Sequence, residues 1–366
     1  MTSRKNDLIR IKNSLDSSVR LSSAKFVLAE GDSLEVLRKM PSHSVSLILT
    51  DPPYHSTKKL NIYGDTHFEE DQHYLEWMAE YAKEWRRILR PNGSMFCFCA
   101  VEMAARLEVL FAKEFNILSH IVWTKPNEPG FDGWKQKMKK EALRQWYAHT
   151  ERIIFAEPAC EGNLFRSPFA NFLRDMRKKS GLTMNQLAEI TGAYGKVNHG
   201  GAVSNWEAGR NTPSRDQYEK MCGALIATGK IESLPPYEDV IRPFIIDGTK
   251  EFTDVWNFQN VRPYKGKHPA EKPADLLEHA ISVTSYPGDI VLDCFGGSGS
   301  TAFAALRLGR LTVTIEIDPV LVSKIAAGLE VMNSNQDAIS ANVVNKESLI
   351  RKPEKTSQLG LFSGAK

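Results

Sequence analysis

The sequence predicts an α/β protein whose single sheet is assembled from both ends of the chain, with a small helical insert between them. Short apolar, β-branched runs alternate with helical patterns over the first 160 residues. Closely spaced helical segments follow from about Ser167 as far as Pro235-Pro236, and strand patterns resume after Trp256. Strands separated by helices of this length are typical of parallel βαβ units.

The composition of the 366-residue chain is that of an ordinary globular protein. Hydrophobic residues make up 42% and charged residues 25%, which excludes mainly disordered and fibrous proteins. No apolar stretch approaches the roughly 18 residues that a membrane span needs. The five cysteines form no CxxC pair and lie near no histidine at zinc-ligand spacing. We therefore expect a protein without metal, located in a reducing cytoplasm and bound to no membrane.

Positive charge is concentrated in the middle of the chain. The net charge is only +3, but residues 120–230 carry 17 Lys and Arg against 11 Asp and Glu, which leaves a slightly acidic remainder. This distribution is typical of an insert that faces phosphate groups.

The first part of the chain is expected to contain strands at 25–29, 45–50, 94–100, 117–123 and 151–155, with helices at 74–89 and 102–114. Pro91-Asn92-Gly93 is expected to end the first of these helices. The last part predicts strands at 290–292 and 311–317 around a helix at 301–308. Beyond about Asn333 we expect a polar surface extension and a loose tail.

The loop after the strand 45–50 suits the binding of a planar amine. It reads Asp51-Pro52-Pro53-Tyr54, and ligands of an open parallel sheet gather where its strands end. The two prolines make this turn stiff and leave its carbonyl groups free to accept hydrogen bonds. Asp51 and the Pro52 carbonyl would each accept one N–H of an exocyclic amino group, and Tyr54 would stack on the ring. The nitrogen lone pair would then point at an electrophile.

A glycine-rich loop, Asp293 to Ser300, lies between a strand and a helix and suits an adenosine cofactor. Gly297, Gly299 and Ala302 satisfy the pattern G-x-G-x-x-A, and Glu316 follows Gly296 by 20 residues, where a ribose-binding acid is expected. Glycines allow close approach of the backbone, and the helix N-terminus offers unpaired N–H groups. The loop by itself fits NAD and other adenosine cofactors equally.

Together the two loops resemble the β class of amino-group DNA methyltransferases, which use S-adenosylmethionine (SAM) on N6 of adenine or N4 of cytosine. Residues 51–54 match the catalytic motif D/N/S-P-P-Y/F/W, and residues 293–300 match the cofactor motif D-x-F-x-G-S-G-T, with Ser300 replacing the threonine. Further matches are the H-P-x-x-K-P segment at 268–273, cofactor segments at 31–32 and 316–319, Trp123–Pro126, and the strand that opens at Glu151. The catalytic loop precedes the cofactor loop, as in this class.

The resemblance implies a Rossmann-like SAM-dependent methyltransferase sheet in circularly permuted order. We expect a catalytic half at 20–160, a helical insert at 165–235, a SAM-binding half at 250–332 and an extension with a flexible tail at 333–366. The implied catalytic residues are Asp51, Pro52, Pro53 and Tyr54. The implied SAM-binding residues are Asp32, His268, Lys272, Pro273, Asp293, Phe295, Gly297, Ser298, Gly299, Ser300, Glu316 and Asp318.

The implied reaction needs no metal, because positioning and electrostatics carry most of the catalysis. The base is flipped into a pocket at the strand ends, and its nitrogen attacks the sulfonium methyl group in line. We expect the segment His55 to Phe68 to close over the flipped base, with Lys58 and Lys59 contacting DNA.

The insert resembles a helix-turn-helix of the Cro/repressor type. Leu173, Leu187, Ala188, Val203 and Trp206 stand where such a domain has its small core. The expected base contacts come from the region of His199 to Asn205, in particular Asn198, His199, Ser204 and Asn205. The expected phosphate contacts are Lys178, Lys179, Lys196 and Arg210.

The C-terminal segment Gln358-Leu359-Gly360-Leu361-Phe362 resembles the short peptide by which bacterial replication and repair proteins bind the sliding clamp. The clamp resemblance implies a bacterial or phage-encoded protein that binds the clamp. The methyltransferase resemblance implies double-stranded DNA as substrate and a homodimer as the assembly.

The sequence thus predicts a SAM-dependent DNA methyltransferase, with adenine N6 favoured because aspartate at the first catalytic position is the usual choice for adenine. Three alternatives stay open. They are an N4-cytosine methyltransferase, a DNA-binding regulator with an inactive methyltransferase body, and a nicotinamide dehydrogenase built on the glycine-rich loop. The recognition sequence and the existence of a partner restriction enzyme are not encoded in any motif.

Overall fold

The computed structural model describes residues 2–54, 68, 70–126, 139–146, 149–159, 167–193, 201–248, 251–262, 264–265 and 267–350, without the side chains of residues 2, 3, 140 and 335–350. The described strands are β1 (Val19–Ser22), β2 (Phe26–Glu30), β3 (Val45–Thr50), β4 (Leu89–Cys99), β5 (Phe115–Trp123), β6 (Glu151–Pro158), β7 (Val255–Trp256), β8 (Ile290–Asp293) and β9 (Leu311–Glu316). They form one sheet in the order β1-β2-β9-β8-β3-β4-β6-β5-β7. Both ends of the chain contribute to this sheet, as the sequence predicts.

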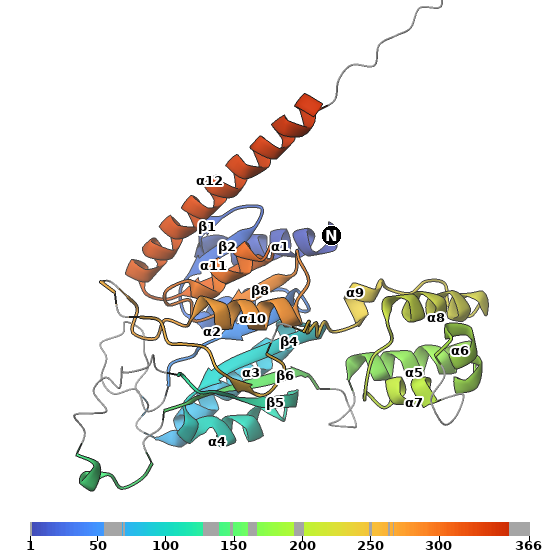
Figure 1. Ribbon diagram of the computed structural model, residues 1–366, viewed down its shortest axis with the longest axis horizontal. Helices are drawn as coiled ribbons and strands as arrows, with labels where there is room; N and C mark the ends of the chain where they lie inside the picture. Colours follow the sequence, from blue (N-terminus) through green and yellow to red (C-terminus); the bar gives the residue numbers. More distant parts are fainter. Residues whose placement is uncertain are drawn as a thin grey trace, which may run out of the picture.

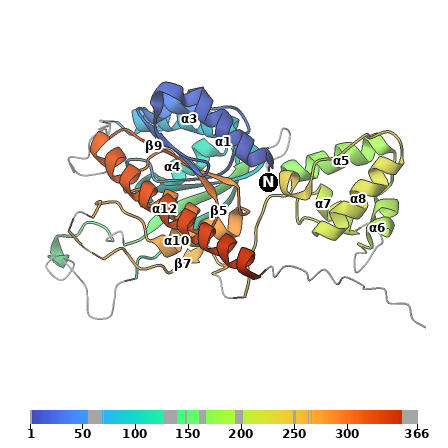
Figure 2. The same ribbon diagram turned by 90° about the horizontal axis from the view of Figure 1, so that it is seen from above.

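Helices cover both faces of the sheet (Figures 1 and 2). One face carries α1 (Thr2–Leu15), α2 (Ser33–Lys39), α3 (Asp71–Ile88) and α4 (Val101–Phe111), whose apolar side chains share a core with the strands. The other face carries α10 (Ala274–Thr284), α11 (Ser300–Arg307) and the start of α12 (Pro319–Ile350). The sequence patterns had indicated no element at α1, α2, α10 or β1. Among the described helices, none combines the length and hydrophobicity that a transmembrane segment needs.

The central strands β2, β9, β8, β3 and β4 are parallel, as expected for βαβ units. The expectation is wrong for β6, which runs antiparallel to both β4 and β5. A parallel connection needs a crossover helix. Between β5 and β6 the described residues contain only the short 3₁₀ turn Lys140–Ala142.

Pro91-Asn92-Gly93 does not form a terminating turn after a helix but lies inside β4. Helix α3 ends at Ile88 and β4 begins at the next residue. Val45 pairs with Leu89 whereas Leu47 pairs with Ser94, so the intervening residues form a bulge. Asn92 Nδ2 donates to the carbonyl groups of Glu238 and Ile241 at 2.8 and 3.3 Å, which anchors the bulge.

The extension beyond Asn333 is helical as far as Ile350, because α12 continues without interruption. No glycine or proline occurs between residues 329 and 352 to end it. Figure 1 shows this helix projecting away from the sheet. Residues 351–366, with the segment that resembles a clamp-binding peptide, lie outside the described part.

Four helices form a second cluster beside the sheet (Figures 1 and 2). They are α5 (Pro168–Ser180), α6 (Met184–Thr191), α7 (Gly201–Glu207) and α8 (Arg215–Ala227), and they share a separate apolar core. The short helix α9 (Tyr237–Val240) follows Pro235-Pro236 and contacts β4. The helical cluster is therefore attached to the sheet close to the bulge of β4.

Candidate active site

The Asp-Pro-Pro-Tyr loop and the glycine-rich loop lie side by side at the carboxyl ends of neighbouring central strands. Their strands β3 and β8 are parallel neighbours, with Leu47 opposite Val291 and Ile48 opposite Leu292. The chain continues from β8 toward β9 on one side and from β3 toward β4 on the other, so the strand order reverses between them. Ligands of open α/β sheets bind at such a point, beyond the carboxyl ends of the strands.

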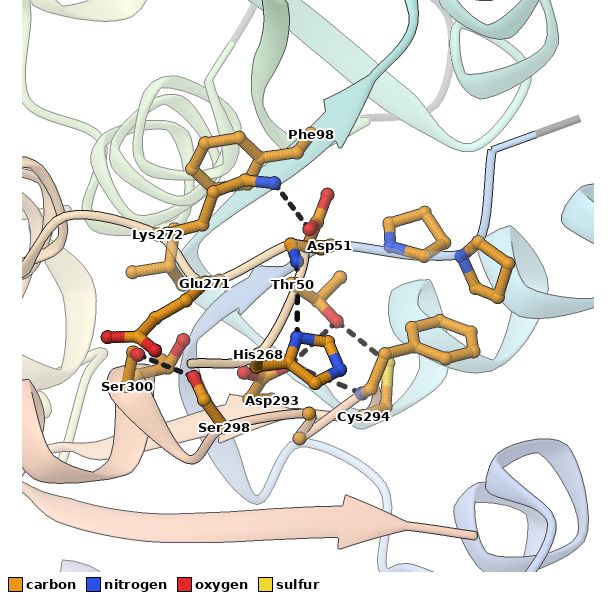
Figure 3. A pocket seen from close by; sticks show the side chains of 18 of the residues that line it. Thr50, Asp51, Phe98, His268, Glu271, Lys272, Asp293, Cys294, Ser298 and Ser300 are labelled. Atoms are coloured by element: carbon orange, nitrogen blue, oxygen red, sulfur yellow. Dashed lines mark hydrogen bonds and ion pairs between the residues drawn. The ribbon is translucent and has the colours of Figure 1, made fainter. Parts of the chain in front are cut away.

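A cavity of about 500 Å³ opens between these loops (Figure 3). It is lined by all four residues of the proposed catalytic motif and by nine of the proposed SAM-binding residues. Those nine are Asp32, His268, Lys272, Asp293, Phe295, Gly297, Ser298, Ser300 and Glu316. Pro273, Gly299 and Asp318 do not line it: Pro273 and Gly299 precede α10 and α11 as N-cap residues, and Asp318 accepts a hydrogen bond from Val320 N at the start of α12.

The glycine-rich loop follows β8 and turns into α11 with its backbone close to β9. Gly296 N donates to the carbonyl of Ile315 at 2.9 Å, which attaches the loop to β9. Gly297 and Gly299 have φ angles of 52° and 79°, values that favour glycine. At Gly296 a Cβ atom would lie 2.7 Å from Thr314 Cγ2, so the backbone there leaves no space for a side chain.

Glu316, at the end of β9, borders the cavity but is already engaged by the backbone. Its carboxylate accepts from Gly297 N at 2.6 Å and from Ile317 N and Asp318 N at 2.8 Å each. Burial raises the pKa of Glu316 against the effect of these hydrogen bonds. The carboxylate therefore holds the glycine-rich loop and the end of β9 together in the absence of a ligand.

Asp293 is the buried acid at the end of β8. Its Oδ1 accepts from Thr50 Oγ1 at 2.9 Å and from Phe295 N at 3.2 Å. Burial raises the pKa of Asp293 to about 7, which places its titration close to neutral pH. A cationic group bound beside it would favour the ionised form.

Asp51 presents one free carboxylate oxygen. Lys272 Nζ lies 2.5 Å from its Oδ2, whereas Oδ1 is buried and has no hydrogen-bond partner among the described residues. A buried acceptor without a partner is costly unless a ligand satisfies it. Burial raises the pKa of Asp51, and the positive charge of Lys272 opposes this rise.

Glu151 and Lys125 also line this end of the cavity, and the sequence assigns no role to either of them. Glu151, at the start of β6, accepts from Tyr54 Oη at 3.2 Å and forms an ion pair with Lys125. Burial would raise the pKa of Glu151, but Lys272 and Lys125 together lower it. The resemblance had marked the segments that contain Lys125 and Glu151. The ion pair between these two residues depends on the antiparallel packing of β6 against β5, which no motif encodes.

Aromatic side chains form much of the remaining wall. Phe98 and Trp123 line the cavity near Lys272 and Lys125, while Trp77 and Tyr81 of α3 line it near the glycine-rich loop. The ring centroid of Phe295 lies 5.8 Å from that of Trp77 and 5.1 Å from that of Tyr81. Such walls suit flat aromatic ligands. The helical spacing of residues 74–89 predicts Tyr81 only as an apolar position and does not include Trp77.

His268 lies against the glycine-rich loop. A Cβ atom on Gly297 would be 3.4 Å from its Cε1. Burial lowers the pKa of His268 below that of an ordinary histidine, which favours the neutral imidazole, and its Nδ1 accepts from Ala270 N at 3.3 Å.

In the helical cluster, the proposed phosphate contacts Lys178, Lys179 and Arg210 are exposed. Ser204 is also exposed, and Asn205 accepts from Arg210 Nη1 at 3.1 Å. Lys58, Lys59, Lys196, Asn198 and His199, and the segment 55–67 that was expected to close over a base, lie outside the described residues.

A short turn joins the first two helices of this cluster. Gly181, with φ 83°, ends α5, and Thr183 begins α6 through a capping box with Gln186. Arg177 of α5 pairs with Glu207 of α7 and ties the third helix to the first.

Comparison with known proteins adds independent findings. Residues 45–327 match the N6_N4_Mtase family model, described as "DNA methylase". The chain is 26% identical to the DNA adenine methyltransferase YhdJ of Escherichia coli (strain K12), covering 80% of this chain and 78% of that one. It is 24% identical to the type II methyltransferase M.PvuII of Proteus hauseri, covering 87% and 89%.

Two solved structures are similar to the chain. One is the PvuII DNA methyltransferase (cytosine-N4-specific), with a TM-score of 0.49 and 19% identity over 83% of this chain and 86% of that one. The other is the M1.HpyAVI–SAM complex, with a TM-score of 0.47 and 18% identity over 83% and 98%.

Proposed function

The chain belongs to the DNA methylase family whose model it matches over residues 45–327, and on this premise we propose that it transfers a methyl group from SAM to N6 of adenine in double-stranded DNA. One observation carries the proposal. The unpartnered Oδ1 atom of Asp51 and the glycine-rich loop belong to the same cavity. An acceptor for an amino group and a loop suited to an adenosine cofactor thus lie within one site.

The mechanism follows from the free oxygen of Asp51. The amino group of a flipped base donates one N–H to Asp51 Oδ1 and the other to the carbonyl of Pro52, while Tyr54 stacks on the base. Both contacts favour a nitrogen lone pair directed at the sulfonium methyl group. The C–S bond breaks as the N–C bond forms, and its electrons neutralise the sulfonium. Asp51 needs no strong basicity, because the amine loses its proton readily once it is methylated.

SAM is the methyl donor in this proposal, and the residues of the cavity fit it. His268, Lys272 and Asp293 would hold the methionine end, and Phe295 and Glu316 would hold the adenosine end. Trp77 and Tyr81 extend the aromatic wall on this side. For Glu316 to accept from the ribose hydroxyl groups, it has to share or exchange its three backbone N–H partners.

Adenine is proposed over cytosine because aspartate precedes Pro-Pro-Tyr. The similar proteins include one named for adenine and one named for cytosine N4, so N4 of cytosine is the alternative target. The test is to incubate the purified chain with methyl-labelled SAM and double-stranded DNA, digest the DNA to nucleosides and identify the product by mass. N6-methyladenosine supports the proposal and N4-methylcytosine supports the alternative.

The same assay separates the other candidates. DNA binding without any methylated nucleoside would identify a regulator with an inactive methyltransferase body. A cavity that binds NAD and not SAM in a titration would identify a nicotinamide enzyme. The Asp-Pro-Pro-Tyr motif has no role in either case.

SAM affinity is expected to depend on pH through Asp293. Because burial raises its pKa to about 7, the free protein holds this carboxyl largely protonated at pH 5.5, and binding of the cationic methionine end requires its ionisation. The affinity should therefore rise as the pH rises from 5.5 to 7, by up to about tenfold per pH unit at the acidic end. Calorimetric titration at several pH values measures this. Asp293→Asn should remove the dependence, and an unchanged dependence in that variant would show that another group titrates.

We propose further that the helical cluster binds DNA and reads its sequence, a proposal supported by the basic middle of the chain and by the resemblance of residues 172–225 to a helix-turn-helix. Replacing both Lys178 and Lys179 by glutamine should weaken binding to all DNA sequences alike. The slope of log affinity against log salt concentration should fall by about 1 for each lysine that no longer meets a phosphate group. Lys220→Gln is the control, since Lys220 lies in the same cluster but pairs with Asp216 at 2.7 Å. A double variant with the parent's salt slope would rule out these phosphate contacts.

The remaining partners are proposals as well. A bacterial or phage-encoded, cytoplasmic methyltransferase of this kind fits a restriction-modification system, and a homodimer is the proposed assembly. Gln358–Phe362 is proposed to bind the sliding clamp, which would carry the enzyme to newly replicated DNA. Deleting residues 351–366 should abolish binding to purified clamp in a surface-binding assay. Equal binding by the truncated chain would refute this.

A further inference from the structure

Glu151 contacts the other charged groups and the tyrosine at the catalytic end of the cavity. It comes from β6, whereas its partners come from three other segments. Its Oε2 accepts from Tyr54 Oη at 3.2 Å and lies 3.4 Å from Lys272 Nζ, and its Oε1 pairs with Lys125 Nζ. A single carboxylate therefore contacts the proposed stacking tyrosine, Lys272 and Lys125.

Lys272 is held between two carboxylates and two aromatic rings. Its ammonium group lies 2.5 Å from Asp51 Oδ2 and 3.4 Å from Glu151 Oε2. It also lies 4.9 Å from the ring centroid of Phe98 and 5.6 Å from that of Tyr54. The lysine side chain is only 9% exposed, so these contacts fix its position. Because Lys272 occupies Oδ2, Asp51 retains Oδ1 for a ligand.

We propose that Glu151 is a positioning residue for methyl transfer: it fixes the ring of Tyr54 and holds Lys272 against one oxygen of Asp51, so that only the other oxygen receives the target amine. The inference rests on the proposed function and deepens it. Without the charge of Glu151, Lys272 would keep Asp51 as its carboxylate partner, Lys125 would lose its ion pair with Glu151, and the hydroxyl of Tyr54 would lose an anionic acceptor. Lys272 would then no longer be held at Oδ2 from its other side, and the target amine would meet a displaced tyrosine ring.

The charge of Glu151 also acts on Asp51 directly. Burial raises the pKa of Asp51, Lys272 lowers it, and Glu151 raises it. Removing the negative charge of Glu151 should therefore lower the pKa of Asp51. The titratable groups around Asp51 among the described residues are Lys272, Glu151, Tyr54, His268, Asp293, Cys97, Cys99 and Tyr74.

The experiment compares Glu151→Gln in the full chain with the matched control Glu157→Gln. Glu157 is buried on the same strand and pairs with Arg242 at 2.7 Å, so its replacement reports general damage to β6. For Glu151→Gln we expect kcat to fall about 10- to 100-fold, SAM affinity to change less than threefold, and the acid limb of the kcat–pH profile to move to lower pH. Glu157→Gln should leave that limb in place. If Glu151→Gln retains the parent's kcat, or reduces kcat without moving the acid limb, the positioning role is wrong.

A second measurement does not depend on methyl transfer, so it separates the positioning role of Glu151 from the proposed function. The carboxyl carbons of isotope-labelled aspartates are followed by NMR as the pH is changed. The signal of Asp51 is the one that is missing from the spectrum of Asp51→Asn. A lower pKa of Asp51 in Glu151→Gln supports the direct coupling, and an unchanged one refutes it. If the parent chain methylates no DNA, the proposed function is wrong. If the parent is active and Glu151→Gln changes neither kcat nor the pKa of Asp51, only the positioning role is wrong.

Discussion

Replacing Asp51 by alanine is expected to abolish methyl transfer while SAM binding remains nearly intact. The variant removes the buried Oδ1, which has no other partner within the described part of the chain, and with it the proposed hydrogen bond that orients the amine for attack. We expect kcat to fall by about 10³-fold or more, because removal of one positioned polar group in an active site typically costs 10²- to 10³-fold and orientation suffers in addition. Single-turnover transfer from labelled SAM measures the rate, and calorimetric titration measures SAM affinity.

Asp51→Asn is the matched comparison for this prediction. Asparagine has nearly the same shape, keeps one carbonyl oxygen as an acceptor and occurs at this position in the related catalytic motif. It should therefore retain more activity than alanine. Lys272 keeps Glu151 as a partner in both variants, at 3.4 Å in the parent, which protects the cofactor side of the cavity. If Asp51→Ala loses SAM binding and methyl transfer together, Asp51 belongs to the cofactor site and not to the catalytic one.

Replacing Gly296 by alanine is expected to have the largest effect on cofactor binding. The new Cβ atom would lie 2.7 Å from Thr314 Cγ2 and 3.2 Å from the carbonyl oxygen of Ile315. The loop would have to move away from β9, which breaks the 2.9 Å hydrogen bond from Gly296 N to Ile315 and displaces Gly297 N from Glu316. We expect SAM to bind about 100-fold more weakly, which corresponds to about 2.7 kcal/mol.

Gly288→Ala is the control for general destabilisation. Gly288 lies in the turn before β8 with φ 86°, and a Cβ atom there would meet no atom within 4 Å. This variant should lose some thermal stability through backbone strain but bind SAM as the parent does. SAM binding within threefold of the parent in Gly296→Ala would show that the glycine-rich loop is not the cofactor site.

The sequence indicated the two loops because their chemistry depends on residues that are adjacent in the chain. A stiff Asp-Pro-Pro-Tyr turn after an apolar strand, and glycines between a strand and a helix, have the same local geometry wherever the fold places them. The strands around both loops also follow from local patterns. The same patterns failed at Pro91-Asn92-Gly93, since a bulge anchored by Asn92 to distant carbonyl groups has no local signature.

What the sequence by itself determined is therefore the kind of chemistry: an acceptor for an amine, a loop for an adenosine cofactor and the family to which both belong. The tertiary structure decided which oxygen of Asp51 is free, because Lys272, 221 residues away, occupies the other one. It also decided that Glu151 faces Tyr54, Lys125 and Lys272, since β6 turns back antiparallel beside β4. Charge interactions act through space and not along the chain, so the groups that set the state of Asp51 are found only when the strands are assembled.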